Sequence, residues 1–439
     1  MGKFNNYINK NVLFNVANLN STSQAIKILA GIFTSKAIAV FIGAEGLALV
    51  GNLNNFLKAF QSLSTLGFYK GLVKYIGRYK EQDEVLSKLL STAYFSGFFV
   101  AMGISILCYF NADLVNNFLF GASYNYAYII EILALALPFY TLNMFCFSIM
   151  NGFSKYKILL IISIIGQVVG LLVTLLLIWQ DNIDGALIAI AITPALIFLI
   201  TLVGILFRKN LISFIKISEV SQSMFTKLGP YSLMALATTV AVPMVMILIR
   251  NYIISEIGIK QAGYWEAVNR ISDYYLMFVN SLIVLYLVPK LSLLNTKREF
   301  RAEIVSFYKS LIPYFGGLLL FLYFTRTFVV RLVFSREFQP TEDLFLWQLA
   351  GDFVRVLAMV IAYQFLAKRM FGHFIILEVF LFVTLYFSSI YLIDVFGLEG
   401  VVIGHFLTHL MHFGIVLLIF SSSLFGVISD RDDDTVSHD

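Results

Sequence analysis

Twelve mostly apolar segments, each about 20 residues or longer, follow one another along this chain of 439 residues. A helix of about 20 residues spans the hydrocarbon core of a bilayer, and no stretch alternates as the strands of a membrane β-barrel do. Hydrophobic residues make up 59 % of the chain and charged residues 13 %, against about 45–50 % and 25 % in soluble domains. The pattern predicts an all-α polytopic membrane protein. The predicted segments are 20–43, 46–70, 87–110, 124–150, 157–179, 184–207, 226–250, 262–289, 304–327, 343–367, 371–394 and 398–421.

Basic residues gather in alternate connections between these segments. Such connections face the cytoplasm under the positive-inside rule, so we expect both termini in the cytoplasm. The turn at 326–336, with its three arginines, is the one basic connection on the other side. The basic cytoplasmic connections are 70–88, 155–157, 208–227, 290–301 and 368–369.

The two halves of the chain share a pattern of glycine and asparagine at corresponding segments. Because each half holds six predicted segments, we expect two six-helix lobes of parallel topology around a central cavity. The expected division is an N-terminal lobe at 1–215, a C-terminal lobe at 216–425 and an acidic cytoplasmic tail at 426–439. The matched residues are Gly43, Gly46 and Asn52 in the second segment and Gly258, Gly263 and Asn269 in the eighth.

Charged side chains lie inside several predicted segments, where each costs at least about 2.5–3.5 kcal/mol unless it faces a wet cavity or a partner. Two segments concentrate them on one helical face. We predict that these two faces line a polar cavity; the alternative is that they form buried ion pairs that only hold the bundle together. The faces carry Asn54, Lys58 and Gln61 in the second segment, and Glu266, Arg270 and Asp273, with Asn269 beside them, in the eighth.

The first predicted segment of each lobe carries one cation at similar depth in the membrane. These cations are Lys36 in segment 20–43 and Arg250 in segment 226–250. Together they suit a phosphate, since arginine offers a bidentate fork and lysine a point charge. Both lie close enough to a segment end for their side chains to reach the outer interface instead. Asp352 and Arg355 lie one turn apart and can pair with each other.

Three histidines, His405, His409 and His412, share one face of the last segment. Pore lining or ordinary packing accounts for them better than a metal site, because no carboxylate or thiol partner is evident. The sequence does not fix their role.

No catalytic signature stands out. The chain lacks a GxxxxGK[ST] phosphate loop and any soluble domain of useful size, which excludes ATP hydrolysis by this chain. Cys108 and Cys146 have no metal-ligand neighbours. The polar N-terminus lacks a cleavage site after a short apolar core, so we expect it to be retained. We predict a carrier with no catalytic residues, cofactor, metal or nucleic-acid partner.

Four stretches resemble the Wzx-type flippases for O-antigen and enterobacterial common antigen, in the multidrug/oligosaccharidyl-lipid/polysaccharide exporter superfamily. The resemblance lies in the order and spacing of the stretches and runs from about residue 20 to 420. The stretches are AVFIGAEGLALVGNLNNFLKAFQSLSTLGFYKGLVKYIGRYK at 39–80, SLMALATTVAVPMVMILIR at 232–250, AGYWEAVNRISDYYLMFVNSLIVLYLVPKLSLL at 262–294 and DLFLWQLAGDFVRV at 343–356.

The resemblance implies a V-shaped cavity, alternating access and a bacterial inner-membrane location. The implied substrate is an undecaprenyl-pyrophosphate-linked oligosaccharide, moved from the cytoplasmic to the periplasmic leaflet. Its pyrophosphate would meet the cations and its glycan the polar side chains, while the polyprenyl tail stays in membrane lipid. The predicted substrate-binding residues are Lys36, Lys58, Arg250, Arg270, Asn54, Gln61 and Asn269, and the candidates for ion coupling by protonation are Asp273, Glu266 and Asp352.

Two other functions fit the same architecture. A multidrug exporter coupled to an ion gradient would favour acidic residues for its cationic substrates, whereas bases dominate these segments. A lipid II flippase is weakly disfavoured by the sequence. The expected partners of the chain, which we take to act as a monomer, include a polysaccharide polymerase and a chain-length regulator.

Overall fold

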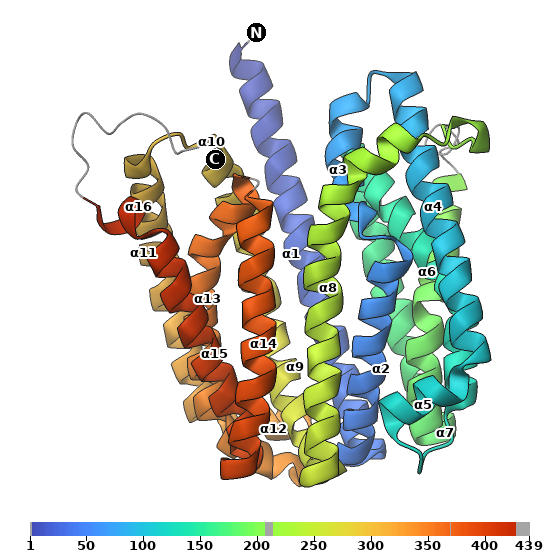
Figure 1. Cartoon of the computed structure of the whole chain (residues 1–439), viewed down its shortest axis with the longest axis vertical. Coiled ribbons are helices and arrows are strands. Elements are labelled where there is room, and N and C mark those ends of the chain that lie inside the picture. Colours follow the sequence, from blue (N-terminus) through green and yellow to red (C-terminus); the bar gives the residue numbers. More distant parts are fainter. Residues whose placement is uncertain (1, 207–213, 369, 427–439) are drawn as a thin grey trace. The chain divides into compact units, whose positions relative to one another are not determined.

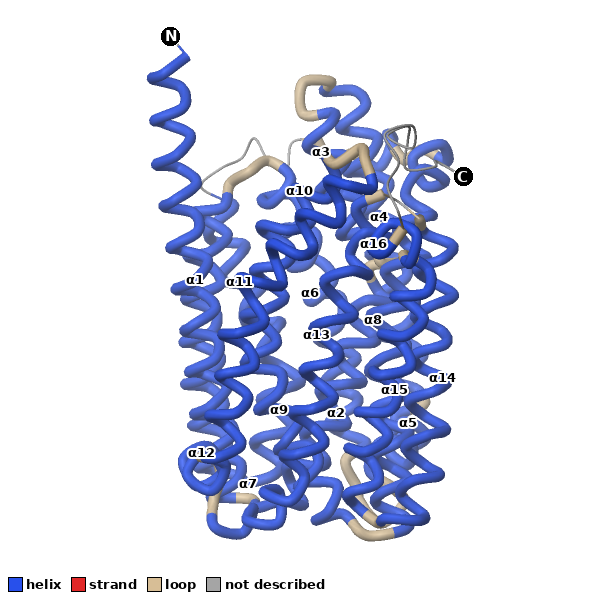
Figure 2. The backbone as a smooth tube through the Cα atoms, turned by 90° about the vertical axis from the view of Figure 1, so that its left-hand side faces the viewer, coloured by secondary structure: helices blue, strands red, loops and turns tan. Residues whose placement is uncertain are grey.

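The computed structural model describes residues 2–206, 214–368 and 370–426, which are almost entirely helical and contain no strand (Figure 1 and Figure 2). The chain divides into two compact units, Met1–Ile247 and Leu248–Asp439, which are described separately. The predicted lobe boundary after residue 215 stays a prediction. Outside the described residues lie 208, 209 and 369 of the basic connections and 427–439 of the predicted tail.

Unit 1 consists of long helices joined by short ones. Within it α7 packs along α1 and α6, and α4 packs against α6. The elements are α1 (Gly2–Phe41), α2 (Gly43–Ser64), α3 (Phe68–Tyr79), α4 (Asp83–Phe110), α5 (Ala112–Phe120), α6 (Ala127–Gly152), α7 (Tyr156–Leu206), the 3-10 turn η2 (Ile217–Glu219) and the larger part of α8 (Gln222–Glu256).

Unit 2 begins in the last turns of α8 and repeats this style of construction. Within it α15 packs along α13 and α14, and α11 packs against α13. The elements that follow α8 are α9 (Ile259–Leu282), the π-helix η3 (Ile283–Leu287), α10 (Val288–Leu293), α11 (Lys297–Phe324), α12 (Arg326–Val333), the 3-10 helix η4 (Arg336–Leu344), α13 (Phe345–Ala367), α14 (Phe371–Phe396), α15 (Leu398–Ile419) and α16 (Ser421–Phe425).

Ten helices in the described part of the chain are long and apolar enough to cross a membrane. This result confirms an all-helical, multi-pass membrane protein. One of the ten is α7, whose helical backbone is broken at Asp181 and Asn182, so it contains two predicted segments, 157–179 and 184–207. Helix α2, predicted as the segment 46–70, does not reach the same apolarity. The total of twelve spans and the cytoplasmic termini stay predictions.

The two units carry the same order of long and short helices, and a pair of glycines marks the repeat in atomic detail. A Cβ atom on Gly185 would lie 1.9 Å from the carbonyl oxygen of Leu177, and one on Gly400 would lie 2.0 Å from that of Leu392. Both members of the second pair lie 215 positions after their counterparts. Only glycine therefore lets the second half of α7 in unit 1, and α15 in unit 2, begin so close to the helical segment before it.

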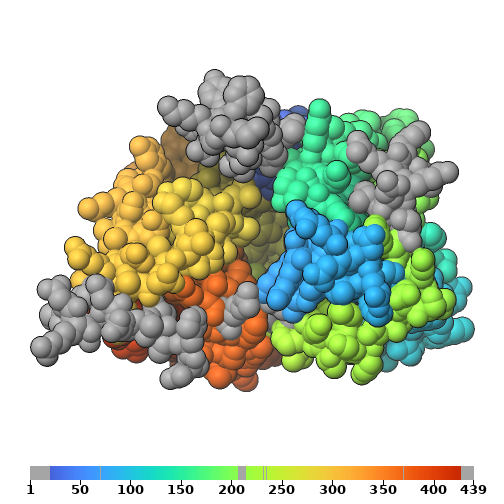
Figure 3. All heavy atoms as spheres, turned by 90° about the horizontal axis from the view of Figure 1, so that it is seen from above, coloured from blue at the N-terminus to red at the C-terminus, as the bar shows by residue number. Residues whose placement is uncertain are grey.

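The short helix α3 is fixed to the long helices of unit 1 by its apolar face. Its apolar face packs into a buried core with α4 and α6, while Lys74 and Arg78 lie on the less buried side. In unit 1, α3 and α5 lie at opposite ends of the long helices (Figure 1). Figure 3 views the end that bears α3, whose light blue atoms lie at the surface. This position suits the cytoplasmic side predicted from its basic residues. The buried face of α3 is Phe68, Leu72 and Ile76.

Candidate functional site

Two arginines share one glutamate in unit 2, where the last turns of α8 meet the start of α9. Nη2 of Arg250 donates to Oε2 of Glu266 at 2.5 Å, and Nε of Arg270 donates to Oε1 of the same carboxylate at 2.9 Å. The Arg250 guanidinium also lies 5.3 Å from the ring centre of Trp265. We call Arg250, Glu266 and Arg270 the arginine–glutamate cluster.

Local sequence explains how these side chains meet. Glu266 and Arg270 are four residues apart on α9 and therefore lie on one helical face. The chain reverses between α8 and α9 at Gly258, whose φ of 129° disfavours any residue with a Cβ. The amide of Gly258 also donates to the carbonyl of Ile253 at 2.9 Å and closes the end of α8. This reversal brings Arg250 beside Glu266.

The cluster carries one more positive charge than negative charge. Arg250 is 1 % exposed, so its guanidinium does not escape to the surface as a snorkelling side chain would. The side chain of Arg270 keeps 14 % of its exposure. Both oxygens of Glu266 are used in the cluster, and an anion that reaches Arg270 would meet the net positive charge of the three side chains.

A second buried polar group lies between α9, α13 and α15. Asp352 on α13 is fully buried and accepts a hydrogen bond from Tyr275 on α9 at 2.5 Å. Its other oxygen lies 3.1 Å from Nε2 of His405 on α15. Arg355, the partner suggested by sequence spacing, lies 4.0 Å away and is 35 % exposed. The structure therefore gives Asp352 closer partners on two other helices than the one on its own helix.

The side chains of the polar face predicted on α2 are more exposed than most other side chains of that helix. The Lys58 side chain is exposed, although Leu57 and Ala59 beside it are buried. Asn54 and Gln61 are half-buried on the same face. This face belongs to unit 1, so the shared cavity predicted between the two lobes stays a prediction.

Three further predicted site residues lie at different depths in their helices. Lys36 on α1 is half-buried, and Asp273 on α9 is exposed. Asn269 is half-buried, and its Nδ2 atom has no hydrogen-bond partner within the described ranges. Asn52, its counterpart in the predicted repeat, is buried and donates to the carbonyl of Leu119 at 2.6 Å.

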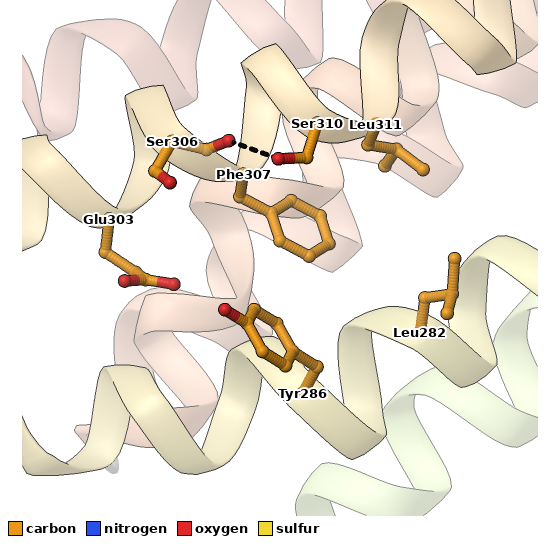
Figure 4. A pocket seen from close by; sticks show the side chains of 7 residues that line it. All are labelled: Leu282, Tyr286, Glu303, Ser306, Phe307, Ser310 and Leu311. Carbon is orange, nitrogen blue, oxygen red and sulfur yellow. Dashed lines mark hydrogen bonds between the residues drawn. The ribbon is translucent and has the colours of Figure 1, made fainter. Parts of the chain in front are cut away.

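A pocket of about 280 Å³ opens between α11 and the η3 end of α9 (Figure 4). The Tyr286 and Phe307 rings stack across it with centroids 6.1 Å apart, and Glu303 lies at its polar side. Lys290 binds that carboxylate at 3.0 Å. None of the predicted site residues lines this pocket.

Sequence reasoning missed Tyr275 and His405 as partners of Asp352, and Glu266 as the bridge between two arginines. The histidine face of the last segment did signal a polar contact, but no spacing rule links residue 405 to residue 352. Within the described residues, no group of three histidine, cysteine or carboxylate side chains is arranged to hold a metal ion.

Comparison with known proteins places these groups in context. A family model described as "Polysaccharide biosynthesis protein" matches residues 15–294, more than half of the chain. The chain is 28 % identical over 403 residues to proteins named lipid III flippase from Escherichia coli (strain K12) and Shigella flexneri, covering 91 % of this chain and 96 % of each relative.

Solved structures share the fold. An inward-facing multidrug resistance MATE family transporter of the MOP superfamily superposes with a TM-score of 0.76 at 14 % identity, covering 91 % of this chain and 95 % of that one. The lipid II flippase MurJ in an inward closed conformation superposes with a TM-score of 0.72 at 15 % identity, covering 93 % of this chain and 87 % of that one.

Proposed function

Because this chain belongs to the polysaccharide biosynthesis protein family, we propose that it is a transporter that moves a lipid-linked oligosaccharide across the membrane. The lipid III flippases support this proposal, since they match 91 % of the chain and 96 % of their own length. We assign the chain no chemical step of its own. In this proposal the substrate passes from the cytoplasmic to the periplasmic leaflet of the bacterial inner membrane by alternating access.

The substrate we propose is an oligosaccharide on undecaprenyl pyrophosphate, such as an O-antigen or common-antigen repeat unit. The pyrophosphate is the part most costly to move through hydrocarbon, because each buried charge needs a counter-charge. The polyprenyl tail needs no such help and stays among the lipids.

The arginine–glutamate cluster is the observation that carries this proposal. It holds a surplus positive charge in the interior of unit 2, and the Arg270 guanidinium presents planar donors that suit phosphate oxygens. Arg250 is buried and pairs with the other oxygen of Glu266, so the single negative charge of this carboxylate is shared between two arginines. In the same proposal Lys36 and Lys58 of unit 1 attract the pyrophosphate, and Asn54, Gln61 and Asn269 bind glycan hydroxyls.

A cation-coupled drug exporter is the second candidate, favoured by the MATE-like fold. Its organic cations would need carboxylates that are not already paired with arginines. Glu266 is engaged twice and Asp352 is fully buried with a tyrosine and a histidine. This electrostatic arrangement favours an anionic substrate over a cationic one.

Glycan display in living cells tests the proposal. The gene is replaced by Arg270→Ala or Lys36→Ala in cells that make a surface polysaccharide through this chain, and membrane levels of each variant are confirmed by immunoblot. We expect both variants to insert normally and to lose surface glycan. Normal display in both would contradict a cationic substrate site. A panel of cationic dyes separates the drug-exporter alternative, since only that function predicts dye sensitivity when the gene is deleted.

A further inference from the structure

One buried polar cluster has no part in the proposed substrate site. It consists of Asp352 on α13 and three histidines, His405, His409 and His412, along one face of α15. We propose that Asp352 and His405 form the proton-binding site that drives transport, and that His409 and His412 carry the proton along α15. The inference rests on the proposed function and assigns its coupling ion.

The contacts place the four side chains in a row. Nε2 of His405 lies 3.1 Å from Oδ1 of Asp352. The rings of His405 and His409 have centroids 4.5 Å apart, and those of His409 and His412 have centroids 6.5 Å apart. Because residues at i, i+4 and i+7 share a helical face, the three rings extend over about 10 Å along the α15 axis.

Helix α13 is shaped to admit His405. A Cβ atom on Gly351 would lie 2.4 Å from Cδ2 and 3.0 Å from Nε2 of the His405 ring. Only a glycine next to Asp352 therefore leaves room for the ring to reach the carboxylate. The contact between Asp352 and His405 therefore depends on Gly351 of α13 as well as on the histidine of α15.

The outer histidines are buried without the partners that buried histidines usually have. His409 is 6 % exposed and His412 is 5 % exposed. Nδ1 of His409 and both ring nitrogens of His412 have no hydrogen-bond partner in the part of the chain that the structure describes. Each buried nitrogen in this state costs about 1–3 kcal/mol. A neutral imidazole carries one nitrogen lone pair that accepts a proton and one N–H that releases one, so side chains of this kind in a row can pass a proton on.

The remaining oxygen sites of Asp352 are occupied in a way that suits a proton and not a sodium ion. Tyr275 donates to Oδ2 at 2.5 Å, and Nε2 of Gln348 lies 3.4 Å from the same atom. Hard metal cations need several free oxygen ligands, whereas here a nitrogen faces Oδ1. Among the charged groups that face this cluster, Arg355 on α13 lies 4.0 Å from Oδ1 of Asp352 and also interacts electrostatically with His409 and His412.

The step is a proton transfer with no change in covalent bonds to carbon. With Asp352 ionised, neutral His405 keeps the hydrogen on Nε2 that faces Oδ1, and the incoming proton adds to the lone pair of Nδ1. The pair then changes from one negative charge to none. A buried pair with no net charge crosses between transporter conformations at a lower desolvation cost than a buried carboxylate with a neutral partner.

Proton binding is tested first without any transport. The full chain is prepared in nanodiscs with ¹⁵N-labelled histidine, which gives few ring signals because it has only five histidines. We expect the ¹⁵N signals of the His405 ring to change as the ring takes up a proton, and to do so only at lower pH in Asp352→Asn, which removes the carboxylate that favours the imidazolium. A His405 ring that never takes up a proton, or that takes it up identically in wild type and in Asp352→Asn, overturns the inference. Gly351→Ala gives a second variant, which should also break the coupling of the two residues.

Transport in proteoliposomes then separates coupling from substrate handling. The probe is a radiolabelled short-chain polyprenyl-pyrophosphoryl-N-acetylglucosamine, followed both as exchange without a gradient and as uptake driven by a pH gradient. We expect Asp352→Asn and His405→Gln to keep exchange but to lose gradient-driven uptake. The control His373→Gln, an exposed histidine on α14, keeps both.

The outcomes distinguish this inference from the function it rests on. Wild-type protein that neither exchanges nor accumulates the probe contradicts the proposed function. Wild-type protein that exchanges the probe but accumulates it only with a sodium gradient overturns the proton assignment alone. Gradient-driven uptake that survives in both Asp352→Asn and His405→Gln overturns it as well.

Discussion

Arg250 donates from Nη2 to Oε2 of Glu266 at 2.5 Å, and this pair joins the end of α8 to the start of α9. The guanidinium is 1 % exposed, so the carboxylate is the counter-charge that allows it to stay ionised in the interior. Arg270 uses the second oxygen of the same carboxylate. The cluster therefore holds α8 against α9 and also determines the charge around Arg270. Each of these two roles gives its own prediction.

Glu266→Gln should destabilise the protein by about 3–5 kcal/mol, because it leaves a buried arginine without its counter-charge. The measurement is the free energy of unfolding, or the shift of the thermal midpoint, of purified protein in nanodiscs. The matched control is Glu303→Gln, whose partner Lys290 is 45 % exposed, and which should cost no more than about 1 kcal/mol. Equal effects of the two substitutions would contradict the buried ion pair.

Replacing Arg250 and Glu266 together by Met and Leu should restore most of the stability lost in Glu266→Gln. A buried ion pair exchanged for apolar residues of similar size is often neutral or stabilising. Surface glycan should nevertheless be lost, although the net charge is unchanged, because Oε1 of Glu266 no longer holds the Arg270 guanidinium in place. Recovery of both stability and glycan display would show that the cluster only holds the helices together.

Lys58→Gln should leave stability within about 0.5 kcal/mol of wild type, because the side chain is exposed. Glycan display should fall sharply if Lys58 attracts the pyrophosphate as proposed. Lys88→Gln is the control, since Lys88 is also a lysine on a long helix but pairs with Glu84 one turn away. Glycan display that falls equally in both variants would point to a general effect of charge.

Gly185→Ala and Gly400→Ala should each destabilise the protein, by about 1–3 kcal/mol or more, because the new methyl group meets a backbone carbonyl about 2 Å away. The control is Gly414→Ala on the same helix as Gly400, where nothing lies within 4 Å of the added Cβ. Thermal unfolding of the three variants compares them directly. A Gly414→Ala variant as unstable as the other two would remove the packing explanation.

Sequence reasoning predicted the helical class and the multi-pass membrane architecture, because apolar runs of membrane length leave few alternatives. It placed 157–179 and 184–207 as two segments, and the backbone break at Asp181 and Asn182 lies between them. It did not anticipate the short helices α5 and α12, since a run of nine or fewer residues between long apolar segments has no strong periodic signal.

Partners across helices were the part that sequence could not supply. The spacing of Asp352 and Arg355 suggested a pair on one helix, but Tyr275 and His405 are the closer partners and come from α9 and α15. Arg250 was assigned to the substrate and Glu266 to ion coupling, and the structure brings them into direct contact. Side-chain spacing along one helix predicts a shared face, whereas contacts between helices depend on how those helices pack.

The central claim is that the chain moves a lipid-linked pyrophosphate, and exchange of a defined probe tests it most directly. Purified wild-type protein in liposomes is given radiolabelled short-chain polyprenyl-pyrophosphoryl-N-acetylglucosamine, and in parallel the same sugar on a polyprenyl chain without phosphate. We predict exchange of the pyrophosphate probe alone, and its loss in Arg270→Gln. Equal exchange of both probes, or transport of a cationic dye in place of either, would contradict the account.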